Sequence, residues 1–126
     1  MAGIVLVAAI LAGLVVHAWL PDSAGTDIAG DALYALAAYT AVVLIAPRLP
    51  APAVGAIALG WCVAIELLQL TPLPGMAAAV LPASMLILGT VFDGRDLIVY
   101  ALTAIVATGV DVAIGRAVAA RRRSTG

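Results

Sequence analysis

A few side chains that could bind a ligand or carry a proton stand out from an otherwise apolar chain. They are His17, Asp31, Glu66, Gln69, Arg95, Asp96 and Tyr100. Glu66 is the most informative of them, because residues 63–68 are otherwise apolar. A carboxylate that faces lipid costs several kcal/mol, so Glu66 must face other helices, be paired or be protonated. Gln69 follows three residues later and shares its helix face.

These residue types favour binding or proton transfer over catalysis. The sequence lacks the P-loop, HExxH and GxSxG patterns, and Ser84 has no evident base or acid partner. A single histidine and a single cysteine, Cys62, argue against a transition-metal site, so we expect no metal and no cofactor. An intramembrane enzyme that uses Asp31, Glu66 and Asp96 stays open, but the sequence favours a protein that is not an enzyme.

The composition predicts that these residues sit in a membrane. Of the 126 residues, 65% are hydrophobic and 10% are charged, and the mean hydropathy is +1.21. Soluble domains are about half apolar and roughly a quarter charged. A soluble chain this short could not bury so much apolar surface. We therefore expect one all-α, polytopic membrane bundle formed by residues 1–126.

Four segments are long and apolar enough to cross the bilayer as helices, which takes about 20 residues each. They are residues 3–20, 31–46, 53–71 and 97–115. Residues 21–30 are polar and rich in turn formers, and we expect a loop there. A fifth apolar segment, 76–92, is short and contains Pro82. It is predicted to form a short outer-side or re-entrant helix, with a fifth span as the alternative.

The arginines predict the orientation, because positive loops face the cytoplasm. With four spans, Arg48, Arg116 and residues 121–123 lie inside and only Arg95 lies outside. With five spans, Arg48 and Arg95 would both lie outside. We therefore expect four spans in the bacterial cytoplasmic (inner) membrane, with both the N and the C terminus in the cytoplasm. Three terminal arginines on a membrane protein do not indicate a nucleic-acid partner.

In this topology the polar residues gather at the outer ends of the spans. His17 lies one turn from the end of the first span, and Asp31 and Asp96 open the second and last spans, where a carboxylate suits the free N–H groups. Arg95 is the basic group that could neutralise the acids there. The cluster is either an ion pair that fixes helix packing, or a polar pocket or proton-binding site open to the outer face.

Three segments of the chain match, in the same order, three sequence motifs that are typical of one protein family. Residues Gly30–Ala35 match Gly-Asp-x-Leu-Trp-Ala, with Tyr34 in place of Trp. Residues Ile65–Leu70 match Val-Glu-x-x-Gln-Leu, and Leu88–Tyr100 match Leu-Gly-x-x-Phe-x-x-x-Asp-Leu-x-x-Tyr. The chain thus resembles a bacterial family of small membrane proteins, the domain of unknown function DUF2809, which is similar to the VanZ-like proteins. His17 stands where that family commonly has arginine.

The resemblance implies a membrane location and a role in the cell envelope. It supplies no activity, because the family is uncharacterised; VanZ-like relatives are associated with resistance to the glycopeptide teicoplanin. The sequence therefore favours a small integral membrane protein that binds an envelope lipid or a partner membrane protein through an outer polar pocket. The alternative is a proton- or solute-coupled transport subunit that uses Glu66.

Overall fold

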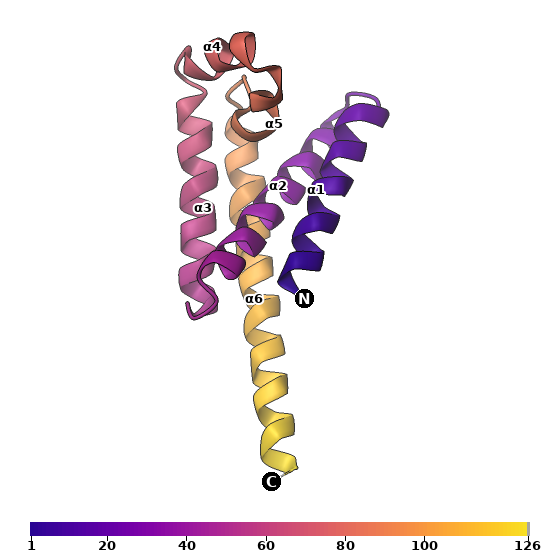
Figure 1. Cartoon of the computed structure of the whole chain (residues 1–126), viewed down its shortest axis with the longest axis vertical. Helices are drawn as coiled ribbons and strands as arrows, with labels where there is room; N and C mark the ends of the chain where they lie inside the picture. Colours follow the sequence, from indigo (N-terminus) through magenta and orange to yellow (C-terminus); the bar gives the residue numbers. More distant parts are fainter. Residues whose placement is uncertain (126) are drawn as a thin grey trace.

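The computed structural model, which describes residues 1–125, is a bundle of long helices with a short helical segment at one end (Figure 1). The elements are α1 (Ala2–Trp19), α2 (Ala24–Ile45), α3 (Ala51–Leu68), α4 (Leu73–Val80), the 3₁₀ turn η1 (Pro82–Ser84), α5 (Met85–Leu88) and α6 (Gly94–Ser124). Four of them, α1, α2, α3 and α6, are long and apolar enough to cross a membrane. The prediction of an all-α membrane bundle is confirmed.

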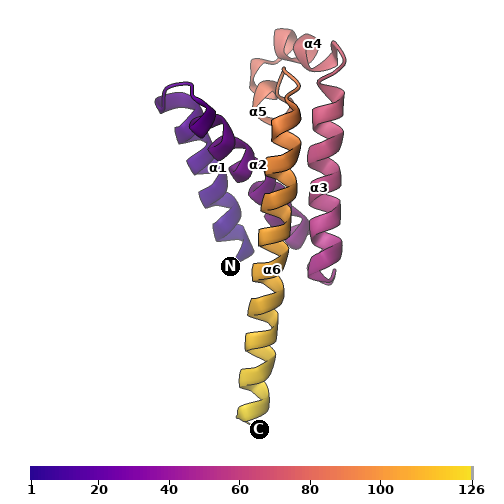
Figure 2. The same cartoon turned by 180° about the vertical axis from the view of Figure 1, so that it is seen from behind.

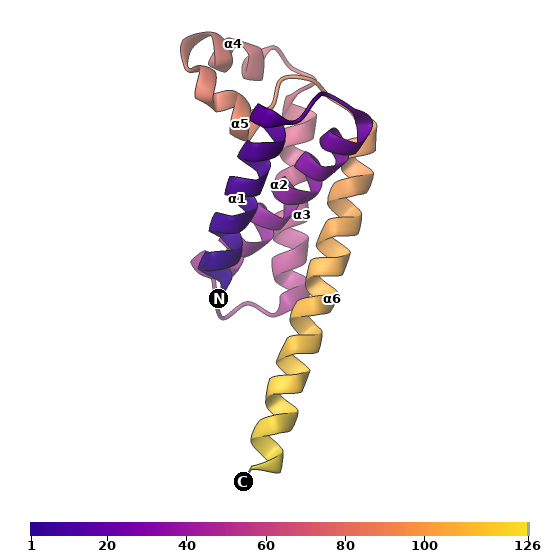
Figure 3. The ribbon, with the colours of Figure 1, turned by 90° about the vertical axis from the view of Figure 1, so that its right-hand side faces the viewer.

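The helices α2, α3 and α6 pack against one another, and α1 packs against α2. Figures 1 and 2 show α3 and α6 side by side, with α2 crossing them at a slant and α1 lying along α2. The α1–α2 hairpin therefore diverges from α3 and α6 toward the end of the bundle that carries α4 and α5, called the α4 end below. Both chain ends lie away from the α4 end (Figure 3).

Small residues let the three central helices approach closely. Buried Ala35, Cys62 and Tyr100 form one packed cluster, and Tyr39, Val54 and Ala58 form a second, with Ala107 against it. Gly55 of α3 lies directly against Thr108 of α6. Helices in lipid associate through such close packing of small residues, because lipid supplies no hydrophobic driving force between them.

The start of α2 differs from the prediction. The helix begins at Ala24, seven residues before the expected start at Asp31. The cause is a capping box: the Ser23 side chain accepts the Thr26 backbone N–H at 3.2 Å, and the Thr26 hydroxyl accepts the Ser23 N–H at 2.9 Å. The expectation that Asp31 opens this helix is therefore wrong. Asp31 lies inside α2, two turns from its start.

The last helix also begins with a different cap. Asp93 precedes α6, and its Oδ1 accepts the backbone N–H of Arg95 at 2.9 Å. Asp96 lies in the first turn instead of at its opening. The helix continues past the predicted end at 115 to Ser124, because no proline interrupts it and arginines suit a helix C-terminus. In α3 the helix ends at Leu68, so Gln69 is its C-cap and not part of its last turns.

The segment 76–92 does not form the single short helix that was expected. It divides into α4, η1 and α5, with the break at Pro82, whose missing N–H prevents α4 from continuing. Neither α4 with eight residues nor α5 with four is long enough to span a bilayer. The prediction that this segment makes no fifth span agrees with these lengths.

Gly89 is the residue that lets the chain leave α5 and return to α6. Its φ of 60° and ψ of −168° lie in a region that residues with a Cβ hardly ever adopt. A Cβ there would also lie 2.5 Å from Nε2 of Gln69. We expect Gly89→Ala to lower the free energy of unfolding by about 1 kcal/mol or more. Thermal unfolding in detergent would measure it, with Gly75→Ala, which meets no atom within 4 Å, as the control that should stay near wild type.

Candidate binding site

A cavity of about 370 Å³ lies at the α4 end, between α1, α2 and the segment that leads into α6. From α1 it is lined by Gly13, Val16 and His17. Its charged lining consists of Asp22, Asp27, Asp31, Asp93, Asp96 and Arg95. Five carboxylates thus face a single guanidinium, and the cavity is strongly acidic.

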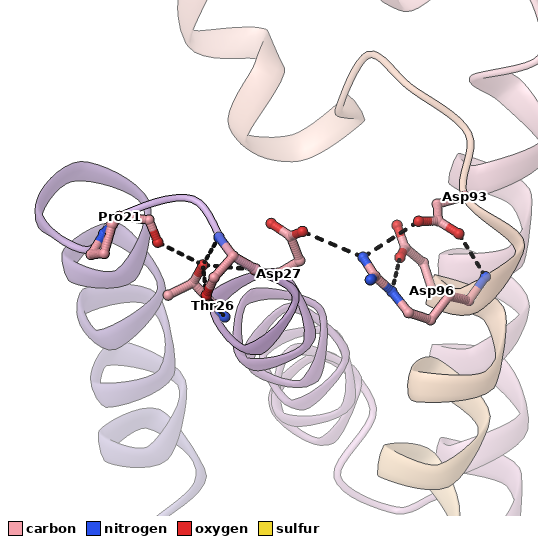
Figure 4. A network of polar contacts seen from close by, with 7 residues as sticks. Pro21, Thr26, Asp27, Asp93 and Asp96 are labelled. Carbon is pink, nitrogen blue, oxygen red and sulfur yellow. Dashed lines mark hydrogen bonds and ion pairs between the residues drawn. The ribbon is translucent and has the colours of Figure 1, made fainter.

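Arg95 of α6 connects this helix with α2 across the cavity, through an ion pair with Asp27. Figure 4 shows its three acidic partners, the labelled Asp27, Asp93 and Asp96. Its Nη2 lies 3.4 Å from Oδ2 of Asp27 and 3.4 Å from Oδ2 of Asp93, and its Nε lies 4.0 Å from Oδ1 of Asp96. The Arg95 side chain is 38% exposed and that of Asp27 is 54% exposed. Exposed pairs of this kind contribute about 0.2–1 kcal/mol each. The network therefore holds the helix ends in register more than it stabilises the fold.

Glu66, one of the acids that Arg95 could have neutralised, is not among the ion-pair partners of that arginine. The Glu66 side chain is completely buried, with 0% of it exposed. Its Oε1 accepts the backbone N–H of Asp93 at 2.6 Å, and its Oε2 has no hydrogen-bond partner in the described chain. This hydrogen bond connects α3 with the start of α6. The residue that Glu66 contacts, Asp93, lines the acidic cavity.

A second cavity, of about 220 Å³, lies beside the first. Its apolar lining comes from Ile65, Met85, Leu86, Ile87 and Val91, and its polar lining from Asp31, Tyr34, Gln69, Asp96 and Tyr100. Asp31 and Asp96 line both cavities, and their carboxyl groups are close enough to interact with each other. This carboxyl pair, one from α2 and one from α6, stands between the two spaces.

Two side-chain hydrogen bonds hold α5 against the second cavity, and a third positions one of the two donors. Gln69 Nε2 donates to the carbonyl oxygen of Leu88 at 2.8 Å. The Tyr34 hydroxyl donates to the carbonyl oxygen of Ile87 at 2.8 Å, and Trp61 Nε1 donates to that hydroxyl at 3.1 Å. Because α5 is only four residues long, these bonds from α2 and α3 fix its position.

Several buried acceptors around the carboxyl pair lack a donor. Asp31 Oδ2, Glu66 Oε2 and Gln69 Oε1 are buried and have no hydrogen-bond partner within residues 1–125. Buried polar atoms in proteins are nearly always hydrogen-bonded, so unmet atoms call for an explanation. Arg95 Nε is an unmet donor in the same region, but it lies 4.0 Å from the nearest carboxylate oxygen of Asp96.

A comparison with known protein families assigns the chain to one of them. A family model described as "Protein of unknown function (DUF2809)" matches residues 20–104, more than half of the chain. The chain belongs to the DUF2809 family. No curated protein and no solved structure matches it. Six of the seven predicted site residues lie within the DUF2809 match, whereas His17 and the arginine end of α6 lie outside it.

The structure brings most of the predicted site residues of this DUF2809 protein together. His17, Asp31, Arg95 and Asp96 line the first cavity. The second cavity is lined by Gln69 and Tyr100, together with the two shared aspartates. Glu66 lines neither cavity.

Sequence reasoning missed three aspartates and a tyrosine, namely Asp22, Asp27, Asp93 and Tyr34. Asp27 precedes Asp31 by four residues, so a helix across 21–30 would have placed them on one face. That signal was lost because the segment was interpreted as a loop. Asp93 stands directly before Gly94, at the cap of the last helix, where an acidic residue is common.

Proposed function

We propose that this DUF2809 protein binds an envelope lipid through the paired cavities at the α4 end. The observation that carries the proposal is the pair itself: a charged cavity adjoins a partly apolar one, and both share Asp31 and Asp96. An amphiphile has the same division into a polar and an apolar part. The presence of four helices apolar enough to cross a membrane supports a location where such a ligand is abundant.

The depth of the first cavity supports a lipid headgroup as its occupant. The cavity is lined from Gly13 of α1 to Asp22 beyond the helix end. At about 1.5 Å per residue, Gly13 lies about 9 Å along the helix axis from Trp19, the last residue of α1. The headgroup layer of a bilayer is about 5–8 Å thick on each side. The cavity therefore extends from the headgroup level to the top of the hydrocarbon.

The test is whether lipid is retained when the cavity is filled. Gly30 lines both cavities, and nothing lies within 4 Å of a Cβ built on it, so Gly30→Leu would place its side chain in the site. Gly60→Leu on α3, also free of neighbours within 4 Å, is the matched control. Native mass spectrometry should find one lipid on wild type and on Gly60→Leu and none on Gly30→Leu. A stoichiometric protein in place of the lipid would favour a partner membrane protein as the ligand. If wild type retains neither a lipid nor a protein, the proposal is refuted.

A second candidate function is proton- or solute-coupled transport that uses Glu66. The observation in its favour is a fully buried carboxylate with one unpaired oxygen beside an acidic cavity. Proteoliposomes with a pH gradient would show a flux in wild type and none in Glu66→Gln. The absence of gradient-dependent flux in wild type would count against this candidate and would leave lipid binding untouched.

The proposal places the α4 end on the outer face of the bacterial cytoplasmic membrane. The connection between α2 and α3, which contains Arg48, and the last part of α6, which carries the arginines after Gly115, lie at the other end of the bundle (Figure 1). The positive-inside bias supports this orientation. In a background where buried Cys62 is replaced by Ser, an impermeant thiol reagent added to intact cells should label Ala78→Cys. It should spare Leu49→Cys in the loop between α2 and α3 until the membrane is opened. The reverse pattern would invert the orientation.

A further inference from the structure

We infer that the ligand of this site carries a primary ammonium group, which Asp31 and Asp96 hold between their carboxylates. The inference rests on the proposed function and specifies its ligand. A lipid headgroup and a free amine could both supply this group.

The charge of the cavity lining favours a cation as its occupant. Five carboxylates line it, and its one guanidinium, Arg95, is already shared among three of them. Arg95 makes its shorter contacts to Asp27 and Asp93 and stays 4.0 Å from Asp96. Asp31 has no ion pair in the described chain. Two carboxyl groups that face each other repel when both are ionised, unless a cation or a proton lies between them.

The unpaired atom of Asp31 indicates that this cation donates hydrogen bonds. Oδ2 of Asp31, a residue that lines both cavities, is buried and lacks a hydrogen-bond donor. A primary ammonium offers three N–H donors together with its charge. A quaternary ammonium offers the charge alone.

Other ligand classes fit less well. The described residues contain no group of three or more His, Cys, Asp or Glu side chains that could hold a metal ion. An anionic headgroup would face five carboxylates across a partly desolvated space, where like charges repel more strongly than in water. A primary ammonium supplies both the positive charge and the donor that Asp31 lacks.

The test compares two headgroups of equal charge. Purified protein would be titrated with phosphatidylethanolamine, with phosphatidylcholine and with phosphatidylglycerol, and occupancy would be measured by native mass spectrometry. Hydrogen bonds to charged groups are worth about 1.5–3 kcal/mol, so we expect the ethanolamine lipid to bind at least about tenfold more tightly than the choline lipid. The glycerol lipid should bind more weakly than either. Equal binding of the ethanolamine and choline lipids would overturn the inference and leave lipid binding intact.

Variants then locate the ammonium. Asp31→Asn and Asp96→Asn should each reduce the preference for the ethanolamine lipid. Asp111→Asn is the matched control, because Asp111 accepts the Tyr39 hydroxyl at 2.8 Å away from both cavities, and it should keep the preference. An undiminished preference in the two site variants would move the ammonium elsewhere and overturn the assignment to this pair.

A soluble amine distinguishes the two sources of the group. Ethanolamine alone, added without lipid, should bind only weakly if the lipid is the natural ligand. Tight binding of ethanolamine, with no retained lipid, would support the ammonium site and overturn lipid binding. If neither a lipid nor ethanolamine binds, both the proposed function and this inference fail.

Discussion

Replacing Glu66 with alanine is expected to lower the free energy of unfolding by about 3 kcal/mol or more. Two losses add up. The side chain is completely buried, so its removal leaves a cavity between α3 and the start of α6. The backbone N–H of Asp93 also loses its acceptor at 2.6 Å, and an orphaned buried donor costs about 1–3 kcal/mol by itself. Steric-trap unfolding in bicelles would measure the difference.

Glu66→Gln separates the hydrogen bond from the charge. The amide oxygen of glutamine can still accept the Asp93 N–H, and the side chain has nearly the same volume. This variant should therefore keep most of the wild-type stability. If glutamine were as destabilising as alanine, the role of Glu66 as the acceptor that ties α3 to α6 would be wrong.

The second large effect is expected at Gly55, where α3 meets α6. A Cβ at this position would fall against the Oγ1 of Thr108, far inside van der Waals contact. Threonine is β-branched and has only two favoured χ1 rotamers in a helix, so relief of the contact requires a change of rotamer or a shift of the two helices. We expect Gly55→Ala to cost about 2–3 kcal/mol through overpacking. Gly60→Ala, one and a half turns along the same helix and free of neighbours, should have little effect.

A double variant tests the cause. In Gly55→Ala combined with Thr108→Ala, the clashing oxygen is gone, and the remaining neighbour atom, the Ala104 carbonyl oxygen, lies 3.7 Å away at ordinary contact distance. The pair should recover most of the stability lost in Gly55→Ala. A cost that persists in the double variant would mean that glycine is needed there for its backbone and not for space.

The long helices could be predicted because lipid imposes both their length and their apolar composition. The first span was expected at residues 3–20 and is observed at Ala2–Trp19. The start of α2 could not be predicted from composition, since Ser23 and Thr26 form a capping box inside a segment that otherwise has the composition of a loop. The local hydrogen bonds of the capping box start the helix at Ala24, although the polar residues that follow favour a loop.

The sequence predicted only some of the residues that line the two cavities, and it did not predict which side chains pair with one another. The cost of burying a charge in lipid correctly predicted that Glu66 turns inward. Its partner is a backbone N–H that Gly89 and the following turn bring into place, and no side-chain pattern encodes such a partner. The pairing of Arg95 with Asp27 depends on where α2 begins. Because the predicted start of α2 was too late, Asp27 was assigned to a loop and was not recognised as a partner of Arg95.

The unusual length of α6 determines which part of the bundle can move. Its 31 residues extend about 46 Å, whereas the hydrocarbon core is about 30 Å thick. In the proposed orientation this surplus would carry Arg121, Arg122 and Arg123 beyond the hydrocarbon core. Sliding α6 toward the α4 end would draw these charges into lipid, at up to about 2.5–3.5 kcal/mol each, so they act as a stop. The helix α1 packs mainly against α2 and has no such run of charges. We therefore expect any widening of the acidic cavity to come from tilting of the α1–α2 hairpin.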